Sequence, residues 1–271
     1  MISQERTAIA FLSKSLHEET LRFANEIAEK TKFNVYIIID DEEPMRIKSN
    51  VAIIQVTDEI ATINGYRGCN IDSNSTHIKK SVIAYDKCLF YFCEMNPKYE
   101  FIWIMEDDCF IPSVDTIVNL HSKYSGYDLV TPNNFKKTDN AMDWHWHSIV
   151  DKIEPLYYYS MVCAMGISKA TLNCVKEYVQ KNDTLFYIEV MFNTLCMQNN
   201  LKCIDAFELK SVVWQGKWDI DEFILLPDNI FHPRKDLENY PKMREMIEVF
   251  RREGYEPTNN LPEFITNLMV S

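Results

Sequence analysis

Three consecutive carboxylates, Glu106, Asp107 and Asp108, follow an unbroken apolar run at 101–105 (FIWIM). Like charges this close repel one another, and each of them resists removal from water. A divalent cation would neutralise the cluster, and a hard ion such as Mg²⁺ or Mn²⁺ prefers oxygen ligands. We therefore predict a site that binds a cation together with a diphosphate. The simpler alternative is a solvated turn with capping acids.

Alternating apolar runs and amphipathic stretches make up the first half of the chain. Strands are predicted at 7–12, 35–39, 51–56 and 101–105, and helices at 17–30, 79–94 and 114–124. Strand, helix and strand at this spacing are typical of a parallel α/β sheet covered on both faces. A second acidic cluster, at 40–43, follows the second strand. Ligands of such sheets bind outside the carboxyl ends of the strands, where both clusters lie.

The second half continues the same alternation. Strands are predicted at 128–131, 157–167 and 203–218, and helices at 168–180 and 187–198. The stretch 133–149 is rich in Trp, His and Asp, which is more typical of a functional loop than of a core element. We predict one domain over 1–235, followed by a helical tail at 236–271 that packs on it.

Composition excludes several classes of partner. The net charge of -12 argues against nucleic acid, which selects for clustered Lys and Arg. No stretch has the roughly 18 apolar residues of a membrane helix, and charged residues stand where a signal peptide has its apolar centre. The eight cysteines form no C-x-x-C pair, which indicates free thiols in a reducing compartment. We therefore expect a cytoplasmic protein without a transmembrane segment.

The order of these features resembles the GT-A glycosyltransferases. The resemblance rests on the strand–helix–strand start, on Asp40 after the second strand, and on an apolar strand leading into EDD and then IP. It covers about 8–232. It implies an α/β fold of the nucleotide-diphospho-sugar transferase type, an α/β/α sandwich with a mostly parallel, Rossmann-like central sheet. In that family the corresponding D-x-D motif binds a metal and a nucleotide sugar.

The resemblance assigns roles to individual positions. It implies that Asp108 ligates Mn²⁺ or Mg²⁺, that Glu106 and Asp107 approach the ribose and the donor sugar, and that Asp40 faces the nucleoside. Glu106 departs from the commoner Asp at the first position. The family often supplies a second metal ligand late in the domain, where this chain has His232; a lone surface or capping histidine is the alternative.

Aromatic residues are candidates for the acceptor site, because their rings stack on sugars. The candidates are Trp144, His145, Trp146, Trp214 and Trp218. His145 and His147 would share one face of a strand and form a rival metal pair. Burial of the tryptophans in the core is the competing interpretation.

A general base is expected to accept the proton of the acceptor hydroxyl. Glu189 is the candidate, because it lies in an apolar helix start where burial raises the pKa of a carboxyl group. Inverting relatives have a similar segment, and Asp183 is the reserve candidate. Glu189 as a helix-capping acid is the alternative. Lys87 is assigned to the diphosphate, with a solvated surface lysine as its alternative.

The sequence thus predicts a metal-dependent, inverting glycosyltransferase that moves a sugar from a nucleotide-diphosphate donor, with a UDP-sugar expected, to a glycan or other hydroxyl acceptor. Its six glycines include neither G-x-G-x-x-G nor a P-loop, which disfavours other nucleotide cofactor sites. The alternatives are a metal-dependent nucleotidyltransferase or phosphohydrolase, and a non-catalytic protein that binds nucleotide sugars.

Overall fold

The computed structural model describes residues 2–43, 49–70, 81–138, 149 and 152–253. Its described strands form a seven-stranded sheet and a separate two-stranded ribbon. In spatial order the sheet consists of β3 (Ala52–Gln55), β2 (Asn34–Ile39), β1 (Thr7–Ser13), β4 (Phe101–Glu106), β8 (Ala164–Ser168), β5 (Leu129–Thr131) and β9 (Cys203–Asp205). Only β8 runs against its neighbours among these seven, because it pairs antiparallel with both β4 and β5. The ribbon pairs β6 (Phe135–Lys136) with β7 (Tyr158–Tyr159).

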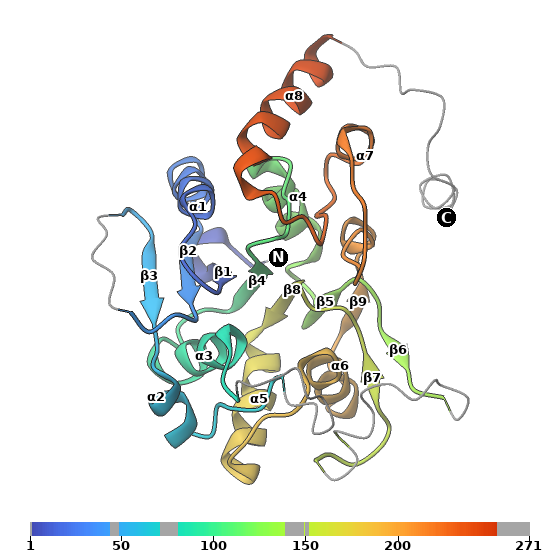
Figure 1. Cartoon of the computed structure of the whole chain (residues 1–271). Helices are drawn as coiled ribbons and strands as arrows, with labels where there is room; N and C mark the ends of the chain where they lie inside the picture. Colours follow the sequence, from blue (N-terminus) through green and yellow to red (C-terminus); the bar gives the residue numbers. More distant parts are fainter. Residues whose placement is uncertain (1, 44–48, 71–80, 139–148, 150–151, 254–271) are drawn as a thin grey trace.

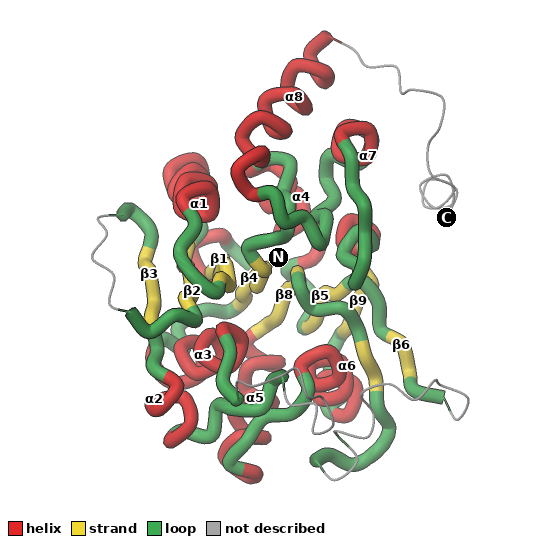
Figure 2. Tube along the Cα trace, in the orientation of Figure 1, coloured by secondary structure: helices red, strands yellow, loops and turns green. Residues whose placement is uncertain are grey.

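Helices cover both faces of this sheet (Figures 1 and 2). One face is covered by α1 (Glu18–Lys30), α4 (Val114–Tyr124) and α8 (Tyr240–Glu253). The other face is covered by α2 (Asp58–Ile63), α3 (Ala84–Phe90), α5 (Lys169–Asn182) and α6 (Ile188–Gln198). A short helix, α7 (Ile220–Leu225), lies beside α8. The predicted α/β/α sandwich with a mostly parallel sheet is confirmed.

The continuous apolar runs arise because each central strand is buried on both faces. In β1, Ala10 and Leu12 belong to the cluster beneath α3, α5 and α6, whereas Ile9 and Phe11 belong to the cluster beneath α1 and α4. Alternate side chains point to opposite faces of a strand, so neither set has a wet side.

Gly166 in β8 makes room for the aromatic residues of β4. A Cβ at this position would lie 2.6 Å from Phe101 Cζ and 2.9 Å from Trp103 Cζ3. Both rings are fully buried, so the sheet is closely packed here. The pairing of β4 with β8 continues from Phe101 to Met105, directly before Glu106.

Three element boundaries differ from the prediction. The predicted strand 203–218 ends at Asp205, and a 3-10 turn, Phe207–Leu209, follows it. The buried residues after the strand, Ala206, Leu209 and Val212, are spaced three apart, which matches the period of a 3-10 helix and not that of a strand. The predicted strand 157–167 is split into β7 and β8. The helix predicted at 79–94 begins at Ala84 and closes with a π-helical turn, Tyr91–Met95.

The tail helix α8 lies against an aromatic cluster. Tyr240, Met243 and Ile247 are buried with Phe110 and Phe223. No helix among the described residues is long and apolar enough to cross a membrane. The division into a domain at 1–235 and a tail at 236–271 stays a prediction.

Candidate active site

The two acidic clusters of the sequence meet at the carboxyl end of β1. The backbone N–H of Asp40 donates to Ser13 O at 2.9 Å, and that of Asp107 donates to Leu12 O at 2.9 Å. The meeting follows from topology, because β2 and β4 flank β1 and run parallel to it. The sheet therefore brings Asp40 and the EDD cluster to one edge.

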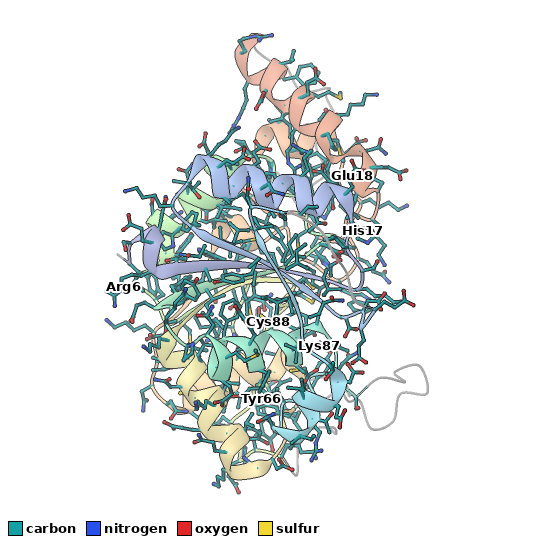
Figure 3. The ribbon with its side chains drawn as sticks, turned by 90° about the vertical axis from the view of Figure 1, so that its left-hand side faces the viewer. Arg6, His17, Glu18, Tyr66, Lys87 and Cys88 are labelled. Carbon is teal, nitrogen blue, oxygen red and sulfur yellow. The ribbon has the colours of Figure 1, made fainter. Side chains whose placement is uncertain are left out.

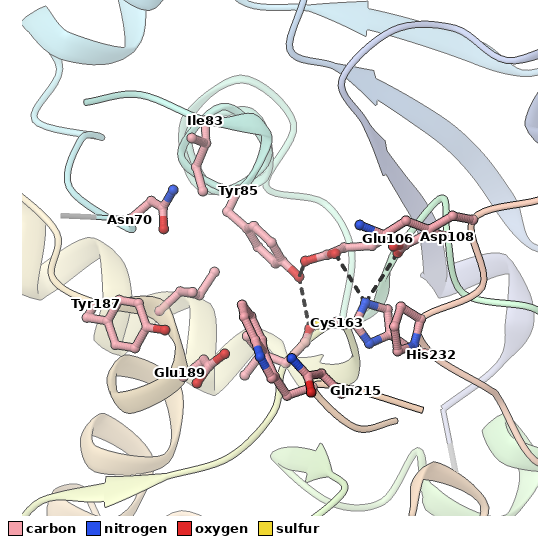
Figure 4. Close-up of a pocket in the computed structure, with 15 residues that line it drawn as sticks. Asn70, Ile83, Tyr85, Glu106, Asp108, Cys163, Tyr187, Glu189, Gln215 and His232 are labelled. Carbon is pink, nitrogen blue, oxygen red and sulfur yellow. Dashed lines mark hydrogen bonds and ion pairs between the residues drawn. The ribbon is translucent and has the colours of Figure 1, made fainter. Parts of the chain in front are cut away.

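A pocket of about 780 Å³ opens beside β4 (Figure 4). Its walls come from the first turn of α3, the end of β4, the residues directly before β8, the start of α6, and the segments on either side of α7. The lining residues used below are Tyr85, Glu106, Asp108, Cys163, Glu189, Trp214, His232 and Lys235.

His232 faces the carboxylates of Glu106 and Asp108. Its Nε2 lies 3.3 Å from Asp108 Oδ1 and 3.7 Å from Glu106 Oε2. Its Nδ1–H donates to Val213 O at 2.8 Å, which fixes the ring and turns Nε2 toward the acids. Burial lowers the pKa of His232, but hydrogen bonds to acidic partners, Asp108 foremost, outweigh this and raise the pKa to about 12.

Glu106 is held by a tyrosine that the sequence analysis did not single out. Tyr85 Oη donates to Glu106 Oε1 at 2.8 Å and lies 3.0 Å from Val162 O. Burial, with the charge of Glu106, raises the pKa of Tyr85 far above its usual value, so the phenol stays a donor. Tyr85 therefore fixes one oxygen of Glu106 while the other faces His232.

Asp107 points away from the pocket. Its carboxylate accepts a hydrogen bond from the hydroxyl of Ser13 and lies 3.7 Å from Nε2 of His17. Burial raises the pKa of Asp107, and the Ser13 hydroxyl opposes that shift. Asp107 thus lies on the β1 side of the triplet, and Glu106 and Asp108 lie on the pocket side.

Glu189 lines the same pocket from the first turn of α6. Its residue is 9% exposed, and burial raises its pKa to about 7, against a weaker hydrogen bond to Tyr187 that lowers it. The environment therefore suits a proton acceptor near neutral pH.

Lys87 is buried rather than solvated, and it is absent from the residues that line the pocket. It is labelled on α3 in Figure 3. Its Nζ lies 3.1 Å from Asp40 Oδ1, 2.8 Å from Asp58 Oδ1 and 2.7 Å from Asp40 O. These contacts tie α3 to the end of β2 and to the start of α2. The assignment of Lys87 to a diphosphate stays a prediction, and the contacts seen are those of a residue that holds Asp40 in place.

Replacing Lys87 by Met is expected to lower the free energy of unfolding by about 3 kcal/mol, because two acids lose their shared buried cation. The value is at the low end for such a pair since Asp58 is 37% exposed. Urea unfolding would measure it, with the exposed Lys202→Met as the matched control. Equal stability of the two variants would show that the cluster contributes nothing.

Two of the other predicted residues lie outside the pocket. Asp183 caps α5 in the left-handed conformation, is 73% exposed and pairs with Arg67 at 2.9 Å. Trp218 is buried against Phe231, and its Nε1 donates to His232 O at 2.9 Å. The ring of Trp218 therefore supports the backbone of His232, and its assignment to the acceptor site stays a prediction.

Trp214 lines the pocket and is 71% exposed, so its ring is open to a ligand. Trp144, His145 and Trp146 lie outside the described residues, as does His147 of the rival pair.

The structure also brings in residues without a sequence signal. Tyr85 and Cys163 lie within apolar segments, whose composition predicts core residues. Lys235 lies in a polar stretch, and all three residues line the pocket. Lys235 is the one Lys or Arg among the described lining residues, and it follows His232 by three positions.

The donor set fits a divalent cation. One ligand atom each of Glu106, Cys163 and His232 lies within 4.8 Å of the others. Asp108 Oδ1 is buried, and its nearest charged neighbour among the described residues is His232 Nε2 at 3.3 Å, so both atoms lie at the same space. A histidine that donates its second N–H to a backbone carbonyl is a common feature of metal ligands.

The structure is that of an α/β protein whose candidate site lies at the edge of the sheet where its parallel strands end. No protein-family model matches the chain, and no curated protein matches it.

Several solved structures align with the chain at low similarity. LgtC, as an active-site variant, is 11% identical over 96% of this chain and 99% of its own, with a TM-score of 0.45. The 4-diphosphocytidyl-2C-methyl-D-erythritol synthase from Anaerococcus prevotii is 11% identical over 90% and 99%, with a TM-score of 0.40. A glycosyltransferase that glycosylates the major capsid of PBCV-1 is 11% identical over 89% and 99%, with a TM-score of 0.36. Likeness at this level assigns no activity to the chain.

Proposed function

We propose that this protein is a metal-dependent, inverting glycosyltransferase of the GT-A type. The donor is a nucleotide-diphosphate sugar, with UDP as the expected nucleotide, and the acceptor is a hydroxyl of a glycan or similar molecule. The observation that carries the proposal is the convergence of Glu106, Asp108, His232 and Glu189 on one pocket at the carboxyl edge of the sheet.

Donor binding would use both sides of this edge. Asp108 and His232 would hold Mn²⁺ or Mg²⁺, and the bound cation would neutralise the diphosphate as it leaves. Glu106 and Asp107 would approach the ribose and the donor sugar, and Asp40, at the end of β2, would face the nucleoside. Lys235 would add a positive charge at the pocket wall.

Sugar transfer also requires that the acceptor hydroxyl lose its proton. Glu189 is the residue proposed to accept it, because its carboxylate is buried in the pocket and its pKa of about 7 gives it affinity for a proton. Trp214 would provide an apolar surface for the acceptor sugar. Inversion follows if Glu189 acts as a base, since a nucleophile that forms a covalent intermediate would retain configuration.

Calorimetry with a panel of nucleotide sugars, with and without Mn²⁺, tests the proposal. We expect Mn²⁺-dependent binding of at least one UDP-sugar. Release of a nucleoside diphosphate with sugar transfer identifies a glycosyltransferase, whereas release of a nucleoside monophosphate or of pyrophosphate identifies the nucleotidyltransferase or phosphohydrolase alternative. Binding without any turnover identifies a binding protein.

The pH profile of transfer is a further prediction. The rate is expected to rise as pH increases through about 7 and then to level off, because Glu189 must lose its proton before it can accept another. Initial rates between about pH 5 and pH 9 at saturating donor would measure it. A rate that is flat across this range would exclude Glu189 as the base.

A further inference from the structure

Cys163 contributes a thiol to the pocket, directly before β8. Its carbonyl accepts hydrogen bonds from the backbone N–H of Glu106 at 2.8 Å and from Cys109 Sγ at 3.2 Å. The position of Cys163 is therefore fixed relative to the carboxylate of Glu106. Its thiol is free and its residue 7% exposed, and that exposed part lines the pocket.

Donor atoms of four side chains, namely a thiol, an imidazole and two carboxylates, thus meet in one small space. The thiol of Cys163, the Nε2 of His232 and a carboxylate oxygen of Glu106 lie within 4.8 Å of one another. Asp108 Oδ1 lies 3.3 Å from the same imidazole nitrogen. Ligands around a tetrahedral zinc are separated by roughly 3.5 Å, so these side chains need to move inward by only about 1 Å.

A thiol changes the metal preference of such a site. Carboxylate and imidazole ligands serve Mn²⁺, whereas thiolate ligands favour Zn²⁺ and other soft ions. Cys163 lines the pocket together with the histidine and the two acids, so its thiol is available to the same cation. Four protein ligands would also close the coordination shell of zinc and leave no position for a diphosphate.

We propose that Cys163 is a zinc ligand, and that Zn²⁺ bound by Glu106, Asp108, Cys163 and His232 competes with the Mn²⁺ used for donor binding. When zinc binds, zinc–sulfur and zinc–nitrogen bonds form, the S–H bond of Cys163 and the Nε2–H bond of His232 break, and both protons pass to solvent. The hard Mn²⁺ uses the oxygen and nitrogen ligands and leaves the thiol protonated. This inference rests on the proposed function only in taking the pocket as the cation site.

Cobalt titration of the metal-free protein tests the thiol directly, because a cobalt–thiolate bond gives an absorption band in the near ultraviolet that oxygen and nitrogen ligands do not. We expect the band in the wild type and in the control Cys174→Ser, and its loss in both Cys163→Ser and Cys163→Ala. Zinc affinity, measured against a chelator, should fall at least about 100-fold in both Cys163 variants, and Mn²⁺ affinity by less than about threefold.

A wild-type protein that binds cobalt without this band would overturn the inference, and this result requires no variant that folds. Unchanged zinc affinity in folded Cys163→Ala would overturn it as well. Neither result depends on catalysis, so failure of this inference is distinct from failure of the transferase proposal, which nucleotide-sugar binding with Mn²⁺ decides.

Discussion

Glu189→Gln is expected to lower the rate of sugar transfer by about 10²–10⁴-fold and to leave donor affinity within about twofold. The amide keeps the size of the side chain but cannot accept the acceptor's proton. Donor binding depends on other residues, those at the EDD cluster and at His232. The kcat from release of the nucleoside diphosphate and the Kd from calorimetry would separate the two effects.

The matched control for Glu189→Gln is Glu177→Gln, which makes the same change on the exposed face of α5. It should transfer sugar at the wild-type rate. Burial of a carboxyl group whose pKa lies near 7 also predicts that Glu189→Gln does not unfold the protein. A Glu189→Gln variant that folds and keeps its full rate would remove Glu189 from the mechanism and with it the argument for inversion.

Asp108→Asn is expected to lower Mn²⁺ affinity at least about 100-fold and to abolish the Mn²⁺-dependent part of nucleotide-sugar binding. Asp108 Oδ1 has its nearest cationic partner in His232, at 3.3 Å, and an amide at this place is a weaker ligand without charge. Binding isotherms for Mn²⁺ alone, and for UDP-sugar with Mn²⁺, would measure both losses.

Asp115→Asn is the control for Asp108→Asn, since Asp115 is an exposed acid in the first turn of α4. It should bind Mn²⁺ and donor as the wild type does. If Asp108→Asn retained Mn²⁺-dependent donor binding, the EDD cluster would be a set of capping acids, which is the simpler alternative that its sequence allows.

The sheet could be predicted from sequence because its central strands are buried on both faces. Such strands give unbroken apolar runs, as at 101–105 in β4, and the acids that follow them stand out. The nearness of Asp40 to the EDD cluster also follows from a parallel sheet. His232 could be proposed because it follows the sheet-forming part of the chain, and the structure places it against Asp108.

Other parts of the site depend on contacts that the local sequence does not encode. Tyr85 precedes Glu106 by 21 positions and reads as an apolar helix residue until the fold places it beside the acid. Lys87, only two positions further along, faces Asp40 and Asp58 and is buried. Spacing along the helix cannot distinguish a solvated lysine from one enclosed by acids on other elements. Trp218 is likewise predicted to contact the acceptor, but the fold places its ring behind His232.

A crystal soaked with Mn²⁺ and UDP tests the central claim most directly. The account predicts manganese bonded to Asp108 and His232 and to oxygens of the diphosphate, with the nucleoside on the Asp40 side of β1. Clear density for UDP at another place on the molecule, with solvent alone between Asp108 and His232, would contradict it.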